Sequence, residues 1–504
     1  MGWLVTAGVA SAALAVLPVS AEAAGSTDKP GRASRTSAAA DKLFSADTQG
    51  ATPAQRARMA AEAPLAAAAV RIRTAAEARQ SGFAGVALRQ GTVTVYWRGK
   101  VPADVRRVLD QEGARVPVKV EPARYAAHEL ARAAEKIRAS GNRSIRSVAY
   151  TVRGDGITAT LSSGAKSSLQ LPDVGVPVTV RREPDLPALG GRTGTSDGRS
   201  TSAGVAAAAV TWPSPSRQDD TTPAWGGAHI INSSTNRGNG GWSVRLDSGE
   251  VVDADTKWHC TSGVPILDDA TNTELMVGPA SCGTPGQTYV DPSGDVVNET
   301  AGVNAAWHKP IRGVTLTKPK GGADPAVYDG TGWTQDGWQI DAWESPIAGQ
   351  QVCVSGAETG TFCGVEMTEF VGSNTVWIES YQGDLEETRG VSVIKADINE
   401  PGTLWPDRRT YILKDGSPCN GFPFYKDFDS IGCSSIAFGD GDMGGAVYTI
   451  PREGPESGIL IKGIIVRIHS GRDENPFNYD MVGVDKIAAA YPNMTELTVR
   501  NDRR

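Results

Sequence analysis

Two features of the C-terminal half have residue types that could take part in chemistry. One is a glycine-rich loop, Gly-Asp-Met-Gly-Gly at 441–445, whose glycines allow the backbone to turn sharply. The other is His259, which stands beside Cys260. An imidazole can act as a general base when a partner offers a removable proton. Met443 at the centre of the loop has none, because a thioether cannot be deprotonated and forms no acyl ester that turns over.

The elements that must position these residues are short strands. From Trp225 onward, β-forming runs alternate with Gly, Pro, Asp and Asn, a spacing that predicts an all-β sandwich or barrel. The runs are WSVRL, EVVDADT, GVTLT, TVWIES, AVYTI and GILIKGIIVRI. One helix, DKIAAAYP, is expected near the C-terminus.

A different pattern precedes this region, over residues 83–185. Strands are expected at Thr92–Trp97 and Val116–Val120, with a helix between them that has Pro102 near its start and Gly113 at its end. A second helix is expected to end at Gly141, before the strands SVAYTV and GITATL, which the turn RGDG separates. The order β-α-β-α-β-β predicts a small sheet with helices on one face.

Length and composition set the organisation of the chain. Its 504 residues predict two or three folding units, and a formal net charge of −7 argues against a general nucleic-acid binder. An apolar run over 3–19, followed by Ala-Glu-Ala, is typical of a signal peptide (1–23) and predicts export; a buried helix or a membrane anchor is the alternative. We expect a partly disordered leader at 24–82, a Gly/Ser/Pro-rich linker at 186–224 and the β-rich domain at 225–504.

All six cysteines lie in the C-terminal part, and export favours three disulfide bonds between them. Sequence order suggests that neighbours pair, although six cysteines allow 15 pairings. A zinc site is disfavoured because no CxxC or HxxxH pair is present, and we expect no metal and no cofactor. The suggested pairs are Cys260 with Cys282, Cys353 with Cys363, and Cys419 with Cys433.

Three motifs in fixed order carry a family resemblance: DTKWHC, GQQVCVSGAETGTFCG, and GDGDMGGAVY followed by GILIKGIIVRIHSG. Together they resemble the chymotrypsin-like serine proteases, particularly the secreted bacterial group with a cleaved propeptide. VYWRGKVPADVRRVL and VEPARYAAHELARAAEKI are similar to the propeptide region of that group. The resemblance implies an all-β, chymotrypsin-like double six-stranded β-barrel preceded by a small α/β propeptide-like domain.

The resemblance also implies a role for each site position. His259 falls at the position of the base, Met443 at that of the nucleophilic serine, and Gly313 in GVTLTK at that of the orienting aspartate, with Asp295 as the fallback. Two of the three catalytic groups are then absent, and loss of such a unit costs about 10⁶-fold in rate. Asp442 could pair with a newly formed N-terminus or with a local partner. The loop that would form the oxyanion hole keeps its residues Gly441, Asp442 and Gly444.

Three functions follow as hypotheses. The first is a secreted, inactive protease homologue that binds a peptide or protein in the cleft between its barrels and contacts its own propeptide-like domain, with no nucleic acid and no membrane span. The second is an active serine-type endopeptidase with a non-standard site, and His259 motivates it. The third is a carbohydrate- or surface-binding protein that uses Trp333, Trp338 and Trp343, since aromatic faces stack on sugars; the alternative is that they are loop and core aromatics.

Overall fold

The computed structural model describes the following residues: 32–34, 51–79, 82–140, 144–162, 165, 171–183, 216–217, 219–232, 242–245, 251–253, 259–279, 282, 288–291, 296–300, 314–330, 335–357, 360–378, 381–393, 410–413, 418–419, 422–427, 430–434, 442–453, 457–469 and 478–499. The predicted signal peptide and most of the predicted linker lie outside these residues.

The described residues between 51 and 183 form an N-terminal α/β unit. Its first half is a three-stranded sheet of β2 (Phe83–Arg89), β3 (Thr92–Trp97) and β4 (Val118–Pro122), in the order β2-β3-β4. The helices α1 (Pro53–Glu77) and α2 (Ala103–Gly113) share one hydrophobic core with this sheet. The strand β3 and the helix α2 lie where the alternating and helical patterns predicted them, and β4 begins two residues after the predicted start at Val116. The strand β2 was not predicted, and the single predicted sheet is wrong, because β5, β6 and β7 belong to another sheet.

The helix α1 corrects the expectation of a loosely packed leader for this part of 24–82. Thr52 and Gln55 form a capping box at its start, and Pro53 occupies the first turn, where a missing N–H costs nothing. Its inner face is built from alanines, of which Ala66 and Ala69 are fully buried. Small side chains allow close packing on the sheet, so the helix needs few large apolar residues.

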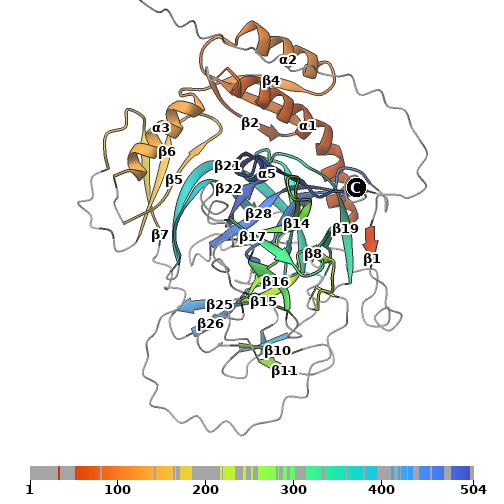
Figure 1. Cartoon of the computed structure of the whole chain (residues 1–504). Coiled ribbons are helices and arrows are strands. Elements are labelled where there is room, and N and C mark those ends of the chain that lie inside the picture. Colours follow the sequence, from red (N-terminus) through yellow and green to blue (C-terminus); the bar gives the residue numbers. More distant parts are fainter. Residues whose placement is uncertain are drawn as a thin grey trace, which may run out of the picture.

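The second half of the α/β unit packs α3 (Ala127–Arg138) on β5 (Ile145–Thr151), β6 (Ile157–Ser162) and β7 (Val178–Glu183). These strands extend a sheet of the C-terminal part, because β5 pairs antiparallel with β21 (Gly360–Ile378). Figure 1 shows β5, β6 and β7 continuing beyond β21, with α1 near the barrel strands.

Six strands close a barrel in the C-terminal part. In order around the ring they are β20 (Gln351–Gly356), β21, β22 (Tyr381–Val393), β29 (Asn478–Gly483), β28 (Ile459–His469) and β27 (Ala446–Thr449), and β27 returns to pair with β20. Every pair in the ring is antiparallel. A sheet that returns to its first strand has no free edge, and this ring agrees with the predicted six-stranded barrel.

The other half of the β-rich region is one sheet in the order β12-β9-β15-β16-β17-β14-β13-β30, called here the first sheet. Its strands are β9 (His229–Asn232), β12 (His259–Thr261), β13 (Val264–Asp268), β14 (Thr273–Pro279), β15 (Thr288–Val290), β16 (Val296–Thr300), β17 (Val314–Pro319) and β30 (Met494–Glu496). Val277 and Leu316 of this sheet share a core with Tyr448 and Ile461 of the barrel. The fold is mostly β, as predicted.

Several further elements complete the description. The strand β1 (Arg32–Ser34) pairs with β19 (Asp336–Trp343), which pairs with β18 (Ala323–Tyr328), and β18 pairs with β8 (Ala224–Gly226). The helix α5 (Val484–Ala490) packs beside β28 and β29. Two small sheets contain β10 (Trp242–Arg245), β11 (Val251–Asp253), β23 (Thr410–Leu413) and β24 (Pro418–Cys419), and β25 (Phe422–Asp427) and β26 (Ser430–Ser434).

The described end of the predicted linker is packed rather than extended. Ser216 and Arg217 are fully buried, and Asp220 is 5% exposed. The C-terminal unit therefore includes residues upstream of Trp225. Within the described residues, no helix is both long and apolar enough to cross a membrane.

Candidate functional site

The loop Asp442–Gly445, called here the 442–445 loop, is a tight turn that leads into β27. Gly445 N donates to Asp442 O over 2.8 Å, which closes the turn. Gly444 N donates to Ile465 O over 2.8 Å, and Ile465 N donates to Gly445 O over 2.9 Å. These bonds fix the loop on strand β28.

Both the backbone conformation and the lack of room for a side chain require a glycine at position 444. Its φ of +97° lies in the left-handed region that favours glycine. A Cβ at this position would overlap Thr261 O and lie 2.8 Å from Pro279 Cδ. The loop therefore contacts the first sheet closely at the ends of β12 and β14.

Met443 occupies this junction. Its side chain is 6% exposed and packs in one cluster with Ile230, Tyr289 and the bonded pair Cys260 and Cys282. Its carbonyl oxygen accepts a hydrogen bond from Thr261 N over 2.8 Å. The structure thus brings together the Met443 position and the Cys260 motif, which are far apart in sequence. Their shared environment is apolar.

His259 is placed through its backbone only. It is the first residue of β12 and lies opposite Ile231 of β9. Thr261, two residues further along the same strand, donates to Met443 O. The strand that carries His259 therefore contacts the loop, while the imidazole itself lies outside the described residues.

Three other predicted site residues also lie outside the described residues: Gly313, its fallback Asp295, and Gly441. Gly313 immediately precedes β17, which begins at Val314. The predicted convergence of three site positions stays a prediction. What the structure brings together are Met443, the Cys260–Cys282 bond and the backbone of β12.

A polar cluster that the sequence did not reveal lies beneath the loop. Asp442 and Arg217 are both fully buried, and Asp329 is 1% exposed. Tyr448 donates to Asp329 Oδ1 over 3.1 Å, and burial raises the pKa of Tyr448 well above its ordinary value. Sequence reasoning placed Arg217 in the linker, because SPSRQDD reads as polar coil.

Two of the three predicted disulfide bonds are confirmed. Cys260–Cys282 joins Cα atoms 6.1 Å apart, and Cys353–Cys363 joins opposite residues of β20 and β21 with Cα atoms 4.0 Å apart. Cys419 and Cys433 belong to β24 and β26, and their side chains lie outside the described residues. Disulfide bonds persist in oxidising compartments, which suggests an extracellular protein.

The tryptophans proposed as a sugar platform do not form one as far as they are described. Trp338 is 3% exposed and belongs to the main core, so no sugar can stack on its face. Trp343 is partly buried against the same core, and Trp333 lies outside the described residues. The core reading of Trp338 is therefore the correct one.

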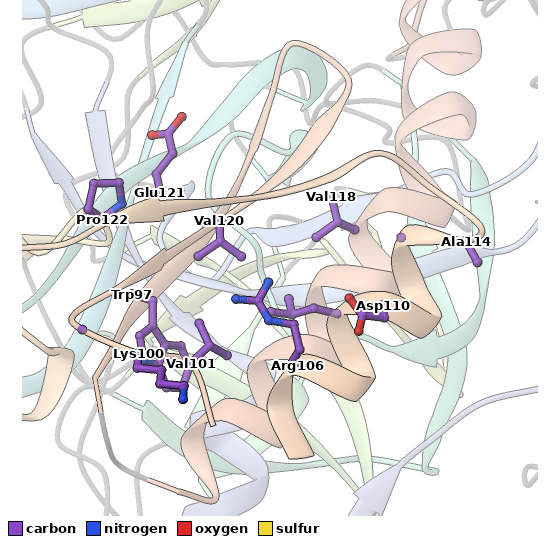
Figure 2. A pocket seen from close by; sticks show the side chains of 13 residues that line it. Trp97, Lys100, Val101, Arg106, Asp110, Ala114, Val118, Val120, Glu121 and Pro122 are labelled. Atoms are coloured by element: carbon purple, nitrogen blue, oxygen red, sulfur yellow. The ribbon is translucent and has the colours of Figure 1, made fainter. Parts of the chain in front are cut away.

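A wide groove lies elsewhere, in the N-terminal α/β unit. It has a volume of about 940 Å³ between α2 and β4, and charged side chains line it together with apolar ones such as Trp97, Leu109 and Val118. Figure 2 shows Arg106 of α2 reaching toward Val120 of β4 across it. Every residue that lines the groove belongs to the α/β unit, so it is separate from the 442–445 loop. The described residues contain no cluster of three His, Cys, Asp or Glu side chains that could hold a metal ion.

No protein-family model and no curated protein sequence matches the chain. Solved structures do. A Nocardiopsis protease matches with 15% identity and a TM-score of 0.28, covering 51% of this chain and 97% of its own. A Cellulomonas bogoriensis chymotrypsin matches with 15% identity and a TM-score of 0.29, covering 52% and 98%.

A third match is a serine protease described as specific for glutamic acid, with 15% identity and a TM-score of 0.32 over 54% of this chain and all of that one. These neighbours are chymotrypsin-like serine proteases. At such TM-scores and identities, nothing about activity or specificity follows for this chain. The fold assignment rests on the closed barrel and the first sheet described above.

Proposed function

We propose that this protein is an extracellular homologue of the chymotrypsin-like serine proteases that has lost catalysis and acts as a binding module. The observation that carries the proposal is Met443, buried against the Cys260–Cys282 bond in a loop whose turn is intact. The scaffold of a nucleophile loop is retained while its central side chain is part of an apolar cluster.

The chemistry supports inactivity in two ways. A thioether offers no proton to a base and forms no acyl ester that turns over. Met443 is also buried in its cluster rather than accessible to a substrate, since only 6% of its surface is exposed. Substrate carbonyls would meet neither a nucleophile nor an open position for one.

A second expected catalytic group, the orienting aspartate, is also absent when Gly313 stands at its position. The loop meets the first sheet at Thr261 and Pro279, and Met443 packs with Cys282, which lies beyond the end of β14. With Gly313 at the aspartate position, a base would have no carboxylate to orient it.

A retained protease fold without turnover can still bind an extended peptide or a protein segment in the cleft between its two β halves. The signal peptide is expected to be removed near Ala23. The α/β unit then stays attached or is separated by another protease within 184–215. Its attachment is supported by the pairing of β5 with β21 and by Met59 of α1, which packs in the barrel core.

Casein hydrolysis by the purified full chain tests the proposal. The wild-type protein is expected to release no peptide above background. Met443→Ser alone is expected to remain inactive, because the orienting carboxylate is still absent. The double variant Met443→Ser/Gly313→Asp is the matched comparison.

The outcome that contradicts the proposal is casein cleavage by the wild-type chain that disappears in His259→Ala. That result would establish the alternative function, a serine-type endopeptidase with a non-standard site. Activity gained by the double variant, and not by Met443→Ser, would support the assignment of Gly313 to the aspartate position.

A further inference from the structure

Arg217 is a fully buried arginine immediately upstream of the β-rich domain, and neither the predicted fold nor the proposed function uses it. Its own carbonyl oxygen accepts a hydrogen bond from His229 N over 2.8 Å, so its backbone is fixed on β9 of the first sheet. A buried guanidinium requires partners for its five N–H donors, since an unpaired buried charge is very costly.

Three hydrogen-bond acceptors of Arg217 belong to β20 and β21 of the barrel. Its Nη1 donates to Ser355 Oγ over 2.9 Å and to Gly356 O over 2.8 Å, at the end of β20. Its Nη2 donates to Thr361 Oγ1 over 3.1 Å, at the start of β21. Nη1 also donates to Gly227 O over 2.9 Å. One side chain thus joins the first sheet to the corner between β20 and β21.

The 442–445 loop meets the same corner at Gly356. Gly356 has space only for a hydrogen, because a Cβ there would overlap the carboxylate of Asp442. Asp442 is fully buried, and its charge raises the pKa of Arg217, although less than Tyr448 and Asp329 do. Burial has the larger effect and lowers that pKa to about 10, so the guanidinium is still a cation at neutral pH.

A second carboxylate and an aromatic ring complete the surroundings of the cation. Asp329 also raises the pKa of Arg217. The guanidinium carbon lies 5.8 Å from the ring centroid of Tyr328, within the range of a cation–π contact. The negative charge of Asp442 therefore lies near a buried cation that belongs to the segment upstream of the β-rich domain.

We propose that Arg217 is the positioning residue of the 442–445 loop: it supplies the buried positive charge that holds Asp442, so the turn forms without a new N-terminus from cleavage. A local group, rather than a free N-terminus, is then the partner of Asp442. It goes beyond the proposed function, because it holds whether or not the loop catalyses a reaction. Any processed form of the protein must then retain Arg217, whereas the chain can be cut upstream of Ser216 without disturbing the loop.

Oxidation of Met443 reports directly on the loop. Dilute hydrogen peroxide converts accessible methionine to its sulfoxide, and peptide mass analysis resolves each methionine. Met276 and Met481 are fully buried in the first sheet and the barrel and serve as internal references. A loss of global stability accelerates the oxidation of all three methionines, whereas a local opening of the loop accelerates the oxidation of Met443 alone.

The full-length Arg217→Gln variant is expected to oxidise at Met443 at least about tenfold faster than wild type, relative to Met276 and Met481. Arg217→Lys keeps the charge and is expected to protect Met443 better than Gln does. Arg452→Gln is the control, since Arg452 is an exposed arginine whose ion pair with Asp341 lies at the surface. Equal acceleration of all three methionines, or none, would overturn the proposal.

A second experiment leaves every native residue in place. A specific protease site inserted within 184–215 is cut after folding, and Met443 oxidation is compared before and after the cut. The proposal requires the same protection of Met443 in both forms. A tenfold loss of protection on cutting would show that chain continuity, rather than Arg217, holds the loop.

Discussion

Gly444→Ala directly tests the packing of the 442–445 loop against the first sheet. The added Cβ would overlap Thr261 O and lie 2.8 Å from Pro279 Cδ. Neither obstacle is the end of a flexible side chain, so relief requires a movement of backbone or of a proline ring. The loop is held by three backbone hydrogen bonds to its surroundings, from Thr261 N, to Ile465 O and from Ile465 N.

Two costs add to give the expected magnitude. A non-glycine residue at φ +97° is strained by about 1–3 kcal/mol. Forcing an extra methyl into a packed site costs about 1–3 kcal/mol more. The expected loss is therefore about 2–6 kcal/mol, which lowers the melting temperature of a domain of this size by roughly 4–24 °C.

Thermal unfolding followed by circular dichroism measures this loss, and Gly91→Ala is the matched control. Gly91 also has a positive φ, +72°, but a Cβ there meets nothing within 4 Å. The control isolates the conformational strain, so Gly444→Ala should be the more destabilising by about 1–3 kcal/mol. Equal losses of stability in the two variants would refute the close contact between the loop and the first sheet.

Three further predictions concern the rest of the fold. Met59→Ala should cost about 2–5 kcal/mol and should lower the unfolding transition of the barrel as well as that of the α/β unit, since Met59 packs within 3.8 Å of Cys353 Sγ; a barrel transition at the wild-type temperature would contradict this. Replacing both Cys353 and Cys363 by alanine should lower the free energy of unfolding by about 3 kcal/mol, because the disulfide bond closes a loop between residues ten positions apart. A denaturant titration measures this loss, and an unchanged midpoint would show that the bond contributes nothing. The hydrogen bond from Arg71 lowers the pKa of Glu112, so this carboxylate stabilises the fold above its unfolded pKa and loses that contribution as the pH falls through its folded pKa. The difference in unfolding free energy between wild type and Glu112→Gln should therefore shrink below about pH 4. A difference that stays constant with pH would exclude the linkage.

Much of the fold could be predicted from the sequence, because local patterns agreed with the final structure. The strand Thr92–Trp97 was predicted with its observed bounds, and α2 was predicted through Pro102 and Gly113 at its ends. The helix α1 was not recognised as part of a core. Its alanines pack closely without being large, and the capping box of Thr52 and Gln55 was the signal that could have identified it.

The site could be predicted in part. The glycines around Met443 indicated a turn, and neighbouring cysteines gave the two pairs that the structure describes. The contact of Met443 with the Cys260–Cys282 bond is a property of two halves that meet in space, and no local pattern contains it. Arg217 was missed for a similar reason, because a charged residue in a polar run gives no indication that its partners lie more than a hundred residues away.

Labelling of the wild-type chain with a fluorophosphonate probe tests the central claim most directly. Such a probe reacts covalently only with a serine that a neighbouring base has activated. Intact-mass measurement after incubation is expected to show the unmodified mass, because Met443 stands where that serine would be. A single added probe mass, mapped to one serine and lost in His259→Ala, would show that the protein has retained a working nucleophile and would contradict the account.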